Sequence, residues 1–169
     1  MALFDLAFIK TLKAEGGYLL HSVQGDKGGQ TYAGISRVFW PDWPGWAMID
    51  AGDIGSMKLE AAVKRLYEVH FWNKVGGDAI AHQAVAETIF DLAVNAGVTV
   101  AVKIAQEIIG VARDGTVGPA TLAAMNKIDP VRLAAEYRLA RVRFRISICR
   151  RDKSQTKFLL GWITRDVEA

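Results

Sequence analysis

The sequence is poor in the residues that build disulfide scaffolds and metal sites, with 1 cysteine and 3 histidines among 169 residues. The lone Cys149 excludes a disulfide framework and a cysteine-based zinc cluster. His21, His70 and His82 include no close pair, so their spacing does not indicate a histidine metal site. We therefore expect a protein that works without a metal or another cofactor.

Long hydrophobic runs are also missing. No stretch approaches the roughly 18 apolar residues that a membrane helix needs, and the start MALFDLAFIKTLKAEGG has neither the basic region nor the cleavage site of a secretory signal. We expect synthesis in the cytoplasm without a signal peptide, and no insertion into a membrane. With 51% hydrophobic and 23% charged residues, the composition is that of an ordinary globular domain and excludes a disordered chain.

Charge is distributed unevenly along the chain. Residues 1–97 carry 8 Lys/Arg and 11 Asp/Glu, whereas residues 98–169 carry 13 and 7, with seven arginines between Arg132 and Arg151. A basic half suits a polyanionic partner such as nucleic acid, an acidic membrane face or carboxylate-rich peptidoglycan, and it also fits a solvated helix face. We do not expect nucleic acid as a partner, because the sequence shows no known module that binds it.

Apolar residues recur at helical spacing through most of the chain, and no strand run of convincing length is present. We expect a mainly α protein in which Gly16-Gly17 end the first helix and a loop or short hairpin follows over residues 18–35. Proline interrupts residues 38–46 too often for a regular element. Further helices are expected after Ser56 with His70 on its apolar face, over 84–97 and 99–109, after Gly118-Pro119, over 130–149, and around 158–163.

Glu15 is the carboxylate with the most unusual expected placement. It lies in the last turn of the first predicted helix, where the partial negative charge of a helix C-terminus disfavours a carboxylate by ~0.3–1 kcal/mol. A general acid uses the protonated carboxyl, and the neighbouring Tyr18 can shield that group from water. The same pattern also fits a solvent-facing glutamate at a frayed helix end.

A second carboxylate, Asp26, follows in the glycine-flanked loop GDKGGQTYAGI, and the hydroxyl of Thr31 lies five residues further on. Two carboxyl groups that flank a bond are the usual equipment of a glycoside hydrolase, and a nearby hydroxyl can position a water. These residues are also ordinary turn formers, because Asp-Lys-Gly-Gly is a plausible hairpin tip. The loop lacks the phosphate-binding patterns GxxxxGK[ST] and GxGxxG.

Aromatic residues gather in the first half of the chain, where their faces can stack on sugar rings or pack in a core. The otherwise apolar helix predicted over 84–97 carries a polar stripe at Glu87, Thr88, Asp91 and Asn95. That stripe fits either a solvent face or the polar floor of a cleft. The candidate substrate contacts are Tyr18, Tyr32, Trp72, Asp91 and Asn95.

Six motifs fall in order along the chain: EGGY at 15–18, GGxTxxGI at 28–35, FW at 71–72, FDLAVNAG at 90–97, DGTVGPATLAA at 114–124 and GWITR at 161–165. Together they resemble glycoside hydrolase family 108, a family of phage-endolysin-like and secretion-associated N-acetylmuramidases with a peptidoglycan-binding-like C-terminal part. The resemblance covers about residues 4 to 167. It implies a lysozyme-like helical fold with Glu15 as catalytic acid, and with Asp26 and Thr31 as partners that position water. The chain departs from the family pattern at His21, which stands in place of an Asp.

The resulting hypothesis is a muramidase that hydrolyses the β-1,4 bond between N-acetylmuramic acid and N-acetylglucosamine in peptidoglycan. Two parts are expected, a catalytic part over residues 1–97 and a peptidoglycan-binding-like part over 98–169, packed as one body. A lytic transglycosylase or a non-catalytic peptidoglycan-binding protein serving secretion or lysis are the alternatives. We expect a monomer that acts on the cell wall in the periplasm after delivery by a holin or a secretion system.

Overall fold

A computed structural model describes residues 1–22 and 29–168, so Asp26 lies outside the described residues. The chain divides into two compact units. One unit is the continuous stretch of residues 8–70, and the other combines residues 1–7 with residues 71–169. These units are defined by contacts between residues and do not test the expected boundary between a catalytic part over 1–97 and a second part over 98–169. That boundary stays a prediction.

The mainly α prediction is confirmed, because helices account for most of the residues that the structure describes. The helices are α1 (Phe4–Ala14), α2 (Gly45–Asp50), α3 (Met57–Tyr67), α4 (Gln83–Ala96), α5 (Val98–Ile109), α6 (Pro119–Met125), α7 (Pro130–Arg151) and α8 (Leu159–Glu168), with the short helices η1 (Glu68–Trp72), η2 (Gly77–Ala79) and η3 (Lys153–Phe158). The strands are β1 (Leu20–Ser22), β2 (Gln30–Tyr32) and β3 (Ile35–Ser36).

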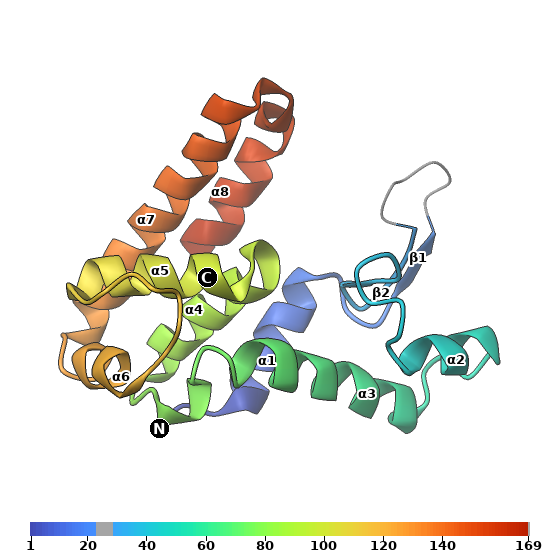
Figure 1. The fold of residues 1–169 in the computed structure, drawn as a ribbon. Helices are drawn as coiled ribbons and strands as arrows, with labels where there is room; N and C mark the ends of the chain where they lie inside the picture. Colours follow the sequence, from blue (N-terminus) through green and yellow to red (C-terminus); the bar gives the residue numbers. More distant parts are fainter. Residues whose placement is uncertain (23–28, 169) are drawn as a thin grey trace. The chain divides into compact units, whose positions relative to one another are not determined.

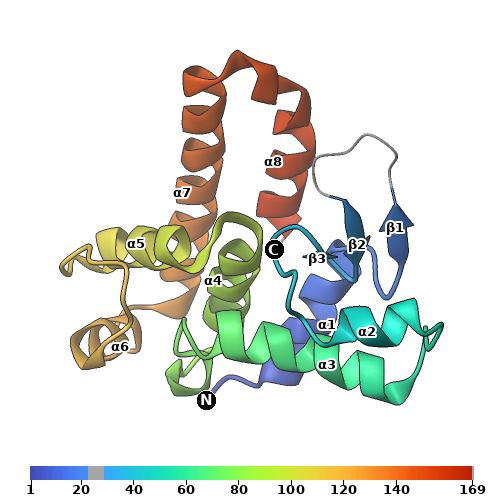
Figure 2. The same ribbon diagram turned by 45° about the vertical axis from the view of Figure 1, so that its right-hand side comes forward.

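A small antiparallel sheet in the order β1-β2-β3 follows α1 in the unit of residues 8–70 (Figure 2). The register pairs Tyr32 with Ile35, and these two side chains are only 0% and 2% exposed, so their face of the sheet is the core side. On the opposite face, Thr31 pairs with His21 on β1 and with Ser36 on β3. The sheet therefore presents a polar row of three residues across its three strands.

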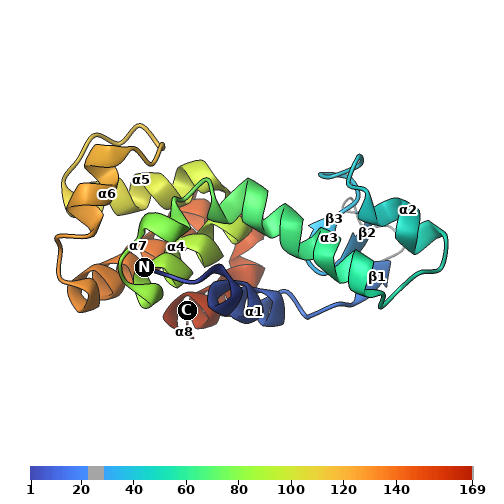
Figure 3. The same cartoon turned by 90° about the horizontal axis from the view of Figure 1, so that it is seen from below.

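Helices α2 and α3 complete this unit (Figure 3). Sequence reasoning missed α2, which begins at Gly45, directly after the last proline of the segment over 38–46. The Ser56 hydroxyl caps α3 as predicted, since it accepts a hydrogen bond from the backbone N–H of Leu59 at 3.2 Å. The expectation that His70 lies on the apolar face is wrong, because the α-helix ends at Tyr67 and the wider π-helix η1 leaves the His70 side chain exposed.

An aromatic core holds the other unit together around α4. Trp72 is 1% exposed, and its ring contacts Phe4 and Phe90 with centroid distances of 5.6 Å each. Its indole Nε1 donates a hydrogen bond to Asp78 at 2.8 Å, which satisfies the polar group of the buried ring. A Cβ on Gly77 would come within 2.2 Å of the Trp72 ring, so only glycine fits at that position.

The basic second half of the chain is partly internal. Helices α7 and α8 lie side by side (Figure 1), and Arg141 and Arg145 of α7 are 0% and 2% exposed. Arg141 pairs with Asp91 of α4, and Arg145 donates to Asn95 one helical turn further on. Both guanidinium groups also donate to Asp166 of α8, at 2.9 and 3.1 Å. Thr88 and Asp91 of the polar stripe on α4 are therefore buried in the seam between α4, α7 and α8, whereas Asn95 at the end of the stripe is exposed.

The connection between α5 and α6 is held by one buried amide. Gln106 is 0% exposed; its side-chain amide donates to the Asp114 carboxylate at 2.7 Å and accepts the backbone N–H of Gly115 at 2.9 Å. The hydrogen bonds from Gln106 and from the Thr116 backbone hold the pKa of Asp114 below its usual value of 3.8. The segment thus forms an ordered turn, and α6 begins after Gly118 as the sequence predicted.

No helix in the described part of the chain has both the length and the apolar character to cross a membrane. Among residues 1–22 and 29–168, no three His, Cys, Asp or Glu side chains gather in a group that could hold a metal ion. Cys149 is buried in α7, as expected for a small apolar side chain.

Candidate active site

Glu15 directly follows α1 and sits where the helix closes. The Gly16 N–H donates to the Lys13 carbonyl at 3.1 Å, and the Gly17 N–H donates to the Leu12 carbonyl at 2.9 Å. These are the paired hydrogen bonds of a Schellman motif, which requires a left-handed residue after the helix. Gly16 supplies it with a φ of +91°, so the two glycines end the helix as predicted and fix where the Glu15 side chain leaves the backbone.

The Glu15 side chain lies against the turn between β2 and β3. A Cβ built on Gly34 would come within 3.0 Å of Glu15 Cγ and within 2.6 Å of the Tyr67 hydroxyl oxygen. Ala33 and Gly34 have φ values of +50° and +77°, as in a type I′ turn. The Tyr67 hydroxyl donates to the Ala33 carbonyl at 2.8 Å, so α3 holds the turn in place against Glu15.

The Glu15 side chain is buried unevenly. The residue as a whole is half-buried, whereas its Oε1 atom is shielded from water. Protein contacts therefore shield one oxygen of the carboxyl group, while part of the residue remains exposed. This is an arrangement that a proton donor to a bound polymer can use.

Thr31 lies in the centre of the polar row on the sheet, with His21 and Ser36 as its direct neighbours across the strands. Facing residues of adjacent antiparallel strands have Cβ atoms ~4.5–5.5 Å apart, so the imidazole and the two hydroxyl groups form one polar surface. Glu15 and Thr31 are thus brought into the same small unit, in which Glu15 contacts the turn that follows β2. Asp26, predicted between them in sequence, lies outside the described residues.

Tyr18 and Tyr32 stand next to each other with ring centroids 6.4 Å apart. Burial raises the pKa of both phenols above 10.0, and the negative charge of Glu60 raises it further. Both hydroxyl groups are therefore protonated at neutral pH and can donate a hydrogen bond. Tyr18 is half-buried and accessible to a ligand, whereas Tyr32 is 0% exposed and stacks on Trp43.

The remaining predicted substrate contacts belong to the other unit. Trp72 is buried in the aromatic core and Asp91 is 7% exposed. The carboxylate of Asp91 is taken up by Arg141 and by Arg165, whose Nη2 lies 2.7 Å from Oδ1. Asn95 is exposed, although its side-chain oxygen accepts a hydrogen bond from Arg145. A role in substrate binding stays a prediction for all three.

Sequence reasoning missed Gly34 and Tyr67, which position Glu15. Gly34 belongs to the glycine-flanked loop GDKGGQTYAGI, where the sequence did not link it to Glu15, and Tyr67 reads as an ordinary core residue of α3. The only local signal was the pair Ala33-Gly34 between two short β-prone runs, which favours a tight hairpin turn. Glu60, which acts on both tyrosines through its charge, had no signal in the sequence at all.

Comparison with known proteins gives two family matches and a structural match. The model of the family glycosyl hydrolase 108 matches residues 8–97, and that of a predicted peptidoglycan domain matches residues 100–167. Eleven chains of solved structures match, among them SagA of Brucella abortus. The SagA structure has 29% sequence identity and a TM-score of 0.67, and the match covers 98% of this chain and 94% of that chain. The search of curated proteins found no match.

These matches agree in fold and in chemistry. The likeness to SagA extends over nearly the whole chain, and the mainly α fold is lysozyme-like. A glycosyl hydrolase family followed by a peptidoglycan domain makes the protein a glycoside hydrolase that acts on peptidoglycan of the cell wall. Because the first match spans more than half of the residues, the chain belongs to the glycosyl hydrolase 108 family.

Proposed function

We propose that the protein is an N-acetylmuramidase that hydrolyses the β-1,4 bond between N-acetylmuramic acid and N-acetylglucosamine. The observation that carries this proposal is the fixed position of Glu15 between the Schellman motif of α1 and the β2–β3 turn. General acid catalysis requires a carboxyl group that is held still beside the leaving oxygen, and it contributes ~10²–10⁴-fold in rate. Glu15 has that support from both backbone segments.

In the proposed reaction, Glu15 donates its proton to the glycosidic oxygen while the bond from that oxygen to the anomeric carbon breaks. A water molecule attacks the anomeric carbon and supplies the new hydroxyl group there. The Asp26 carboxylate takes the proton of that water, and Thr31, in the polar row with His21 and Ser36, holds the water by hydrogen bonds. Before the next cycle, Asp26 releases that proton to solvent and Glu15 takes one up from solvent.

The proposed substrate contacts divide by exposure. Tyr18 is half-buried and its protonated hydroxyl can donate to a sugar oxygen, and Asn95 is exposed. Tyr32 is buried, and we propose that it supports the site by holding strand β2 in place. Trp72 and Asp91 are buried in the other unit, and their proposed part in substrate binding rests on the sequence alone.

The rest of the proposal concerns where the reaction takes place. The C-terminal part over residues 98–169 would hold the wall polymer while the catalytic part cleaves it. A monomer would reach the wall in the periplasm through a holin or a secretion system. Size-exclusion chromatography with light scattering tests the monomer, and a dimer at micromolar concentration would contradict it.

Digestion of purified peptidoglycan, followed by mass spectrometry of the released fragments, tests the reaction. A muramidase leaves N-acetylmuramic acid at the new reducing end, whereas a glucosaminidase leaves N-acetylglucosamine there. A lytic transglycosylase forms 1,6-anhydro ends that are lighter by one water, because no water adds. Products of either of the last two kinds would contradict the proposal, and so would tight binding to the wall without any fragment released.

A further inference from the structure

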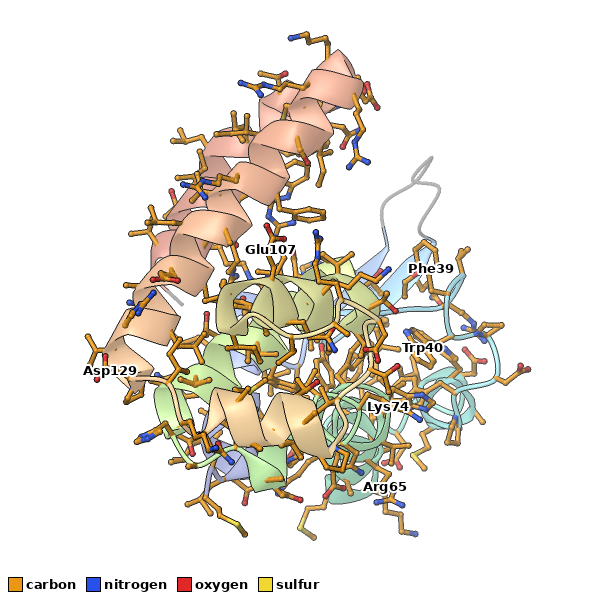
Figure 4. All side chains as sticks on the ribbon, turned by 60° about the vertical axis from the view of Figure 1, so that its left-hand side comes forward. Phe39, Trp40, Arg65, Lys74, Glu107 and Asp129 are labelled. Carbon is orange, nitrogen blue, oxygen red and sulfur yellow. The ribbon has the colours of Figure 1, made fainter. Side chains whose placement is uncertain are left out.

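A pocket of about 530 Å³ opens in the unit of residues 8–70 between the segment over 39–44 and helices α3 and η1. We call it the Trp40 pocket. Phe39 is 79% exposed and Trp40 is half-buried on that segment, with Arg65 on α3 below them (Figure 4). The His70 ring meets the Trp40 ring edge-on at 4.6 Å. The volume of the Trp40 pocket is within the ~300–1,000 Å³ range of small-molecule sites.

The Trp40 pocket is separate from the Glu15 site. Tyr67 holds the turn against Glu15, whereas Ala62 and Arg65 of the same helix line the pocket. At ~100° per residue, these two residues point ~140–160° away from Tyr67 around the axis of α3. Neither Glu15 nor Thr31 contributes to the lining. The lining also includes Leu66, one residue before Tyr67, so the two sites use different but adjoining faces of α3.

The walls of the pocket are fixed before any ligand binds. Trp43 Nε1 donates to the Ala62 carbonyl at 3.3 Å, which ties the segment to α3. Trp46 Nε1 donates to the Trp40 carbonyl at 2.7 Å, which ties the segment to α2. The aromatic side chains of the pocket are therefore already ordered in the free protein, so little conformational entropy is lost when a ligand binds.

The lining combines two kinds of chemistry. Phe39, Trp40 and the flanking prolines offer flat apolar faces, and the exposed side chains of Asp42, Arg65 and His70 surround them with donors and acceptors. A pyranose ring has the matching shape, because one face carries C–H groups and the edge carries hydroxyl groups. An aliphatic peptide side chain would leave the three polar groups unused.

We propose that the Trp40 pocket binds an N-acetylhexosamine ring of the glycan strand, at a distance from the bond that is cut. This inference rests on the proposed function, since it assumes that the glycan strand is the substrate. A second contact on the same unit would hold a long strand near Glu15 between cleavage events and raise its effective concentration there. The contact would lower the KM for polymeric wall and leave kcat unchanged.

The test measures binding of tri-N-acetylchitotriose and of peptide-free glycan strands to the full chain by calorimetry. Trp40→Ala should weaken the binding of glycan strands about tenfold, the usual cost of removing a central aromatic anchor, and Trp40→Phe should restore most of it. The same variant should raise the KM for insoluble wall with an unchanged kcat. Ile54→Ala, which removes an apolar side chain that is 52% exposed in the same unit and does not line the pocket, is the control and should bind like wild type.

Phe39→Ala serves as a second variant, since its side chain is 79% exposed and its loss leaves the core intact. Wild-type binding and KM in both variants would overturn the proposal, as would binding of isolated stem peptides in place of glycan. Those results leave the cleavage of wall by the wild type untouched. Conversely, a chain that releases no fragments but loses glycan binding on Trp40→Ala refutes the muramidase and supports the pocket.

Discussion

Replacing Gly34 by alanine tests whether the β2–β3 turn positions Glu15. The new Cβ would lie 2.6 Å from the Tyr67 hydroxyl oxygen and 3.0 Å from Glu15 Cγ, and φ at this position is +77°. The left-handed backbone alone costs a residue with a Cβ ~1–2 kcal/mol. Overpacking against two side chains adds ~1–3 kcal/mol. We therefore expect Gly34→Ala to lower the free energy of unfolding by ~2–5 kcal/mol.

Gly52→Ala is the matched control in the same unit. Its φ is +81°, and a Cβ there meets nothing within 4 Å, so it carries the backbone cost without the contacts. Urea unfolding followed by tryptophan fluorescence gives both free energies, and the difference between the two variants measures the contacts with Tyr67 and Glu15.

Activity should separate the two variants further. A displacement of the catalytic group by ~1 Å costs on the order of 10²-fold in rate, so Gly34→Ala should clear wall suspensions about a hundred times more slowly under conditions where it is folded. Gly52→Ala should clear them at about the wild-type rate. Equal destabilisation of both variants, with full activity retained in Gly34→Ala, would refute the idea that the turn holds Glu15.

Three further changes have defined outcomes. Tyr67→Phe removes the donor to the buried Ala33 carbonyl and should lower the free energy of unfolding by ~1–3 kcal/mol; an unchanged urea midpoint would contradict this. Asp166→Ala leaves two arginines buried and should cost ~3–5 kcal/mol, whereas Glu136→Ala, at an exposed ion pair, should leave the melting temperature nearly unchanged; equal melting temperatures of the two variants would contradict a stabilising seam. The pKa of Asp114 is lowered in the folded protein, so its ionised carboxylate stabilises the fold above pH 3.8, and this stabilisation is lost as the pH falls through the folded pKa. Asp114→Asn should therefore reduce the dependence of the free energy of unfolding on pH in acid, and an unchanged dependence would disprove this.

Local signals predicted the glycine end of α1, and Glu15, expected in its last turn, is the first residue after the helix. A glycine after a helix takes the left-handed conformation for reasons confined to a few neighbouring residues, and Gly16 does so with a φ of +91°. The support of Glu15 by Gly34 and Tyr67 depends on three segments that are distant in sequence. Periodicity in one segment carries no information about such a contact.

The pairing of the arginines of α7 with α4 could have been predicted from the spacing of the residues in the sequence. Asp91 and Asn95 are four residues apart on α4, and Arg141 and Arg145 are four apart on α7. Matching spacing of opposite polar groups on two helices indicates a paired seam, and the structure has that pairing. Taken alone, each stripe fits a solvent face. The burial of Asp91, Arg141 and Arg145 follows only from the contact between α4 and α7.

Two local errors have separate causes. Helix α2 was missed because the prolines before it were taken as a sign of irregular structure. Proline is nevertheless compatible with the start of a helix, because the first N–H groups of a helix have no partner within it. His70 was assigned to an apolar face by counting 3.6 residues per turn past Tyr67. The π-helix η1 changes that count and leaves the imidazole exposed beside Trp40.

The release of reducing ends from purified peptidoglycan by Glu15→Gln tests the central claim most directly. Glutamine keeps the size of the side chain and cannot donate the proton of a carboxyl group, so the rate should fall on the order of 10²–10⁴-fold, with unchanged wall binding and melting temperature. Asp53→Asn, an equal loss of charge at an exposed position of the same unit, should keep the wild-type rate. A folded Glu15→Gln protein that releases reducing ends as fast as the wild type would contradict the account.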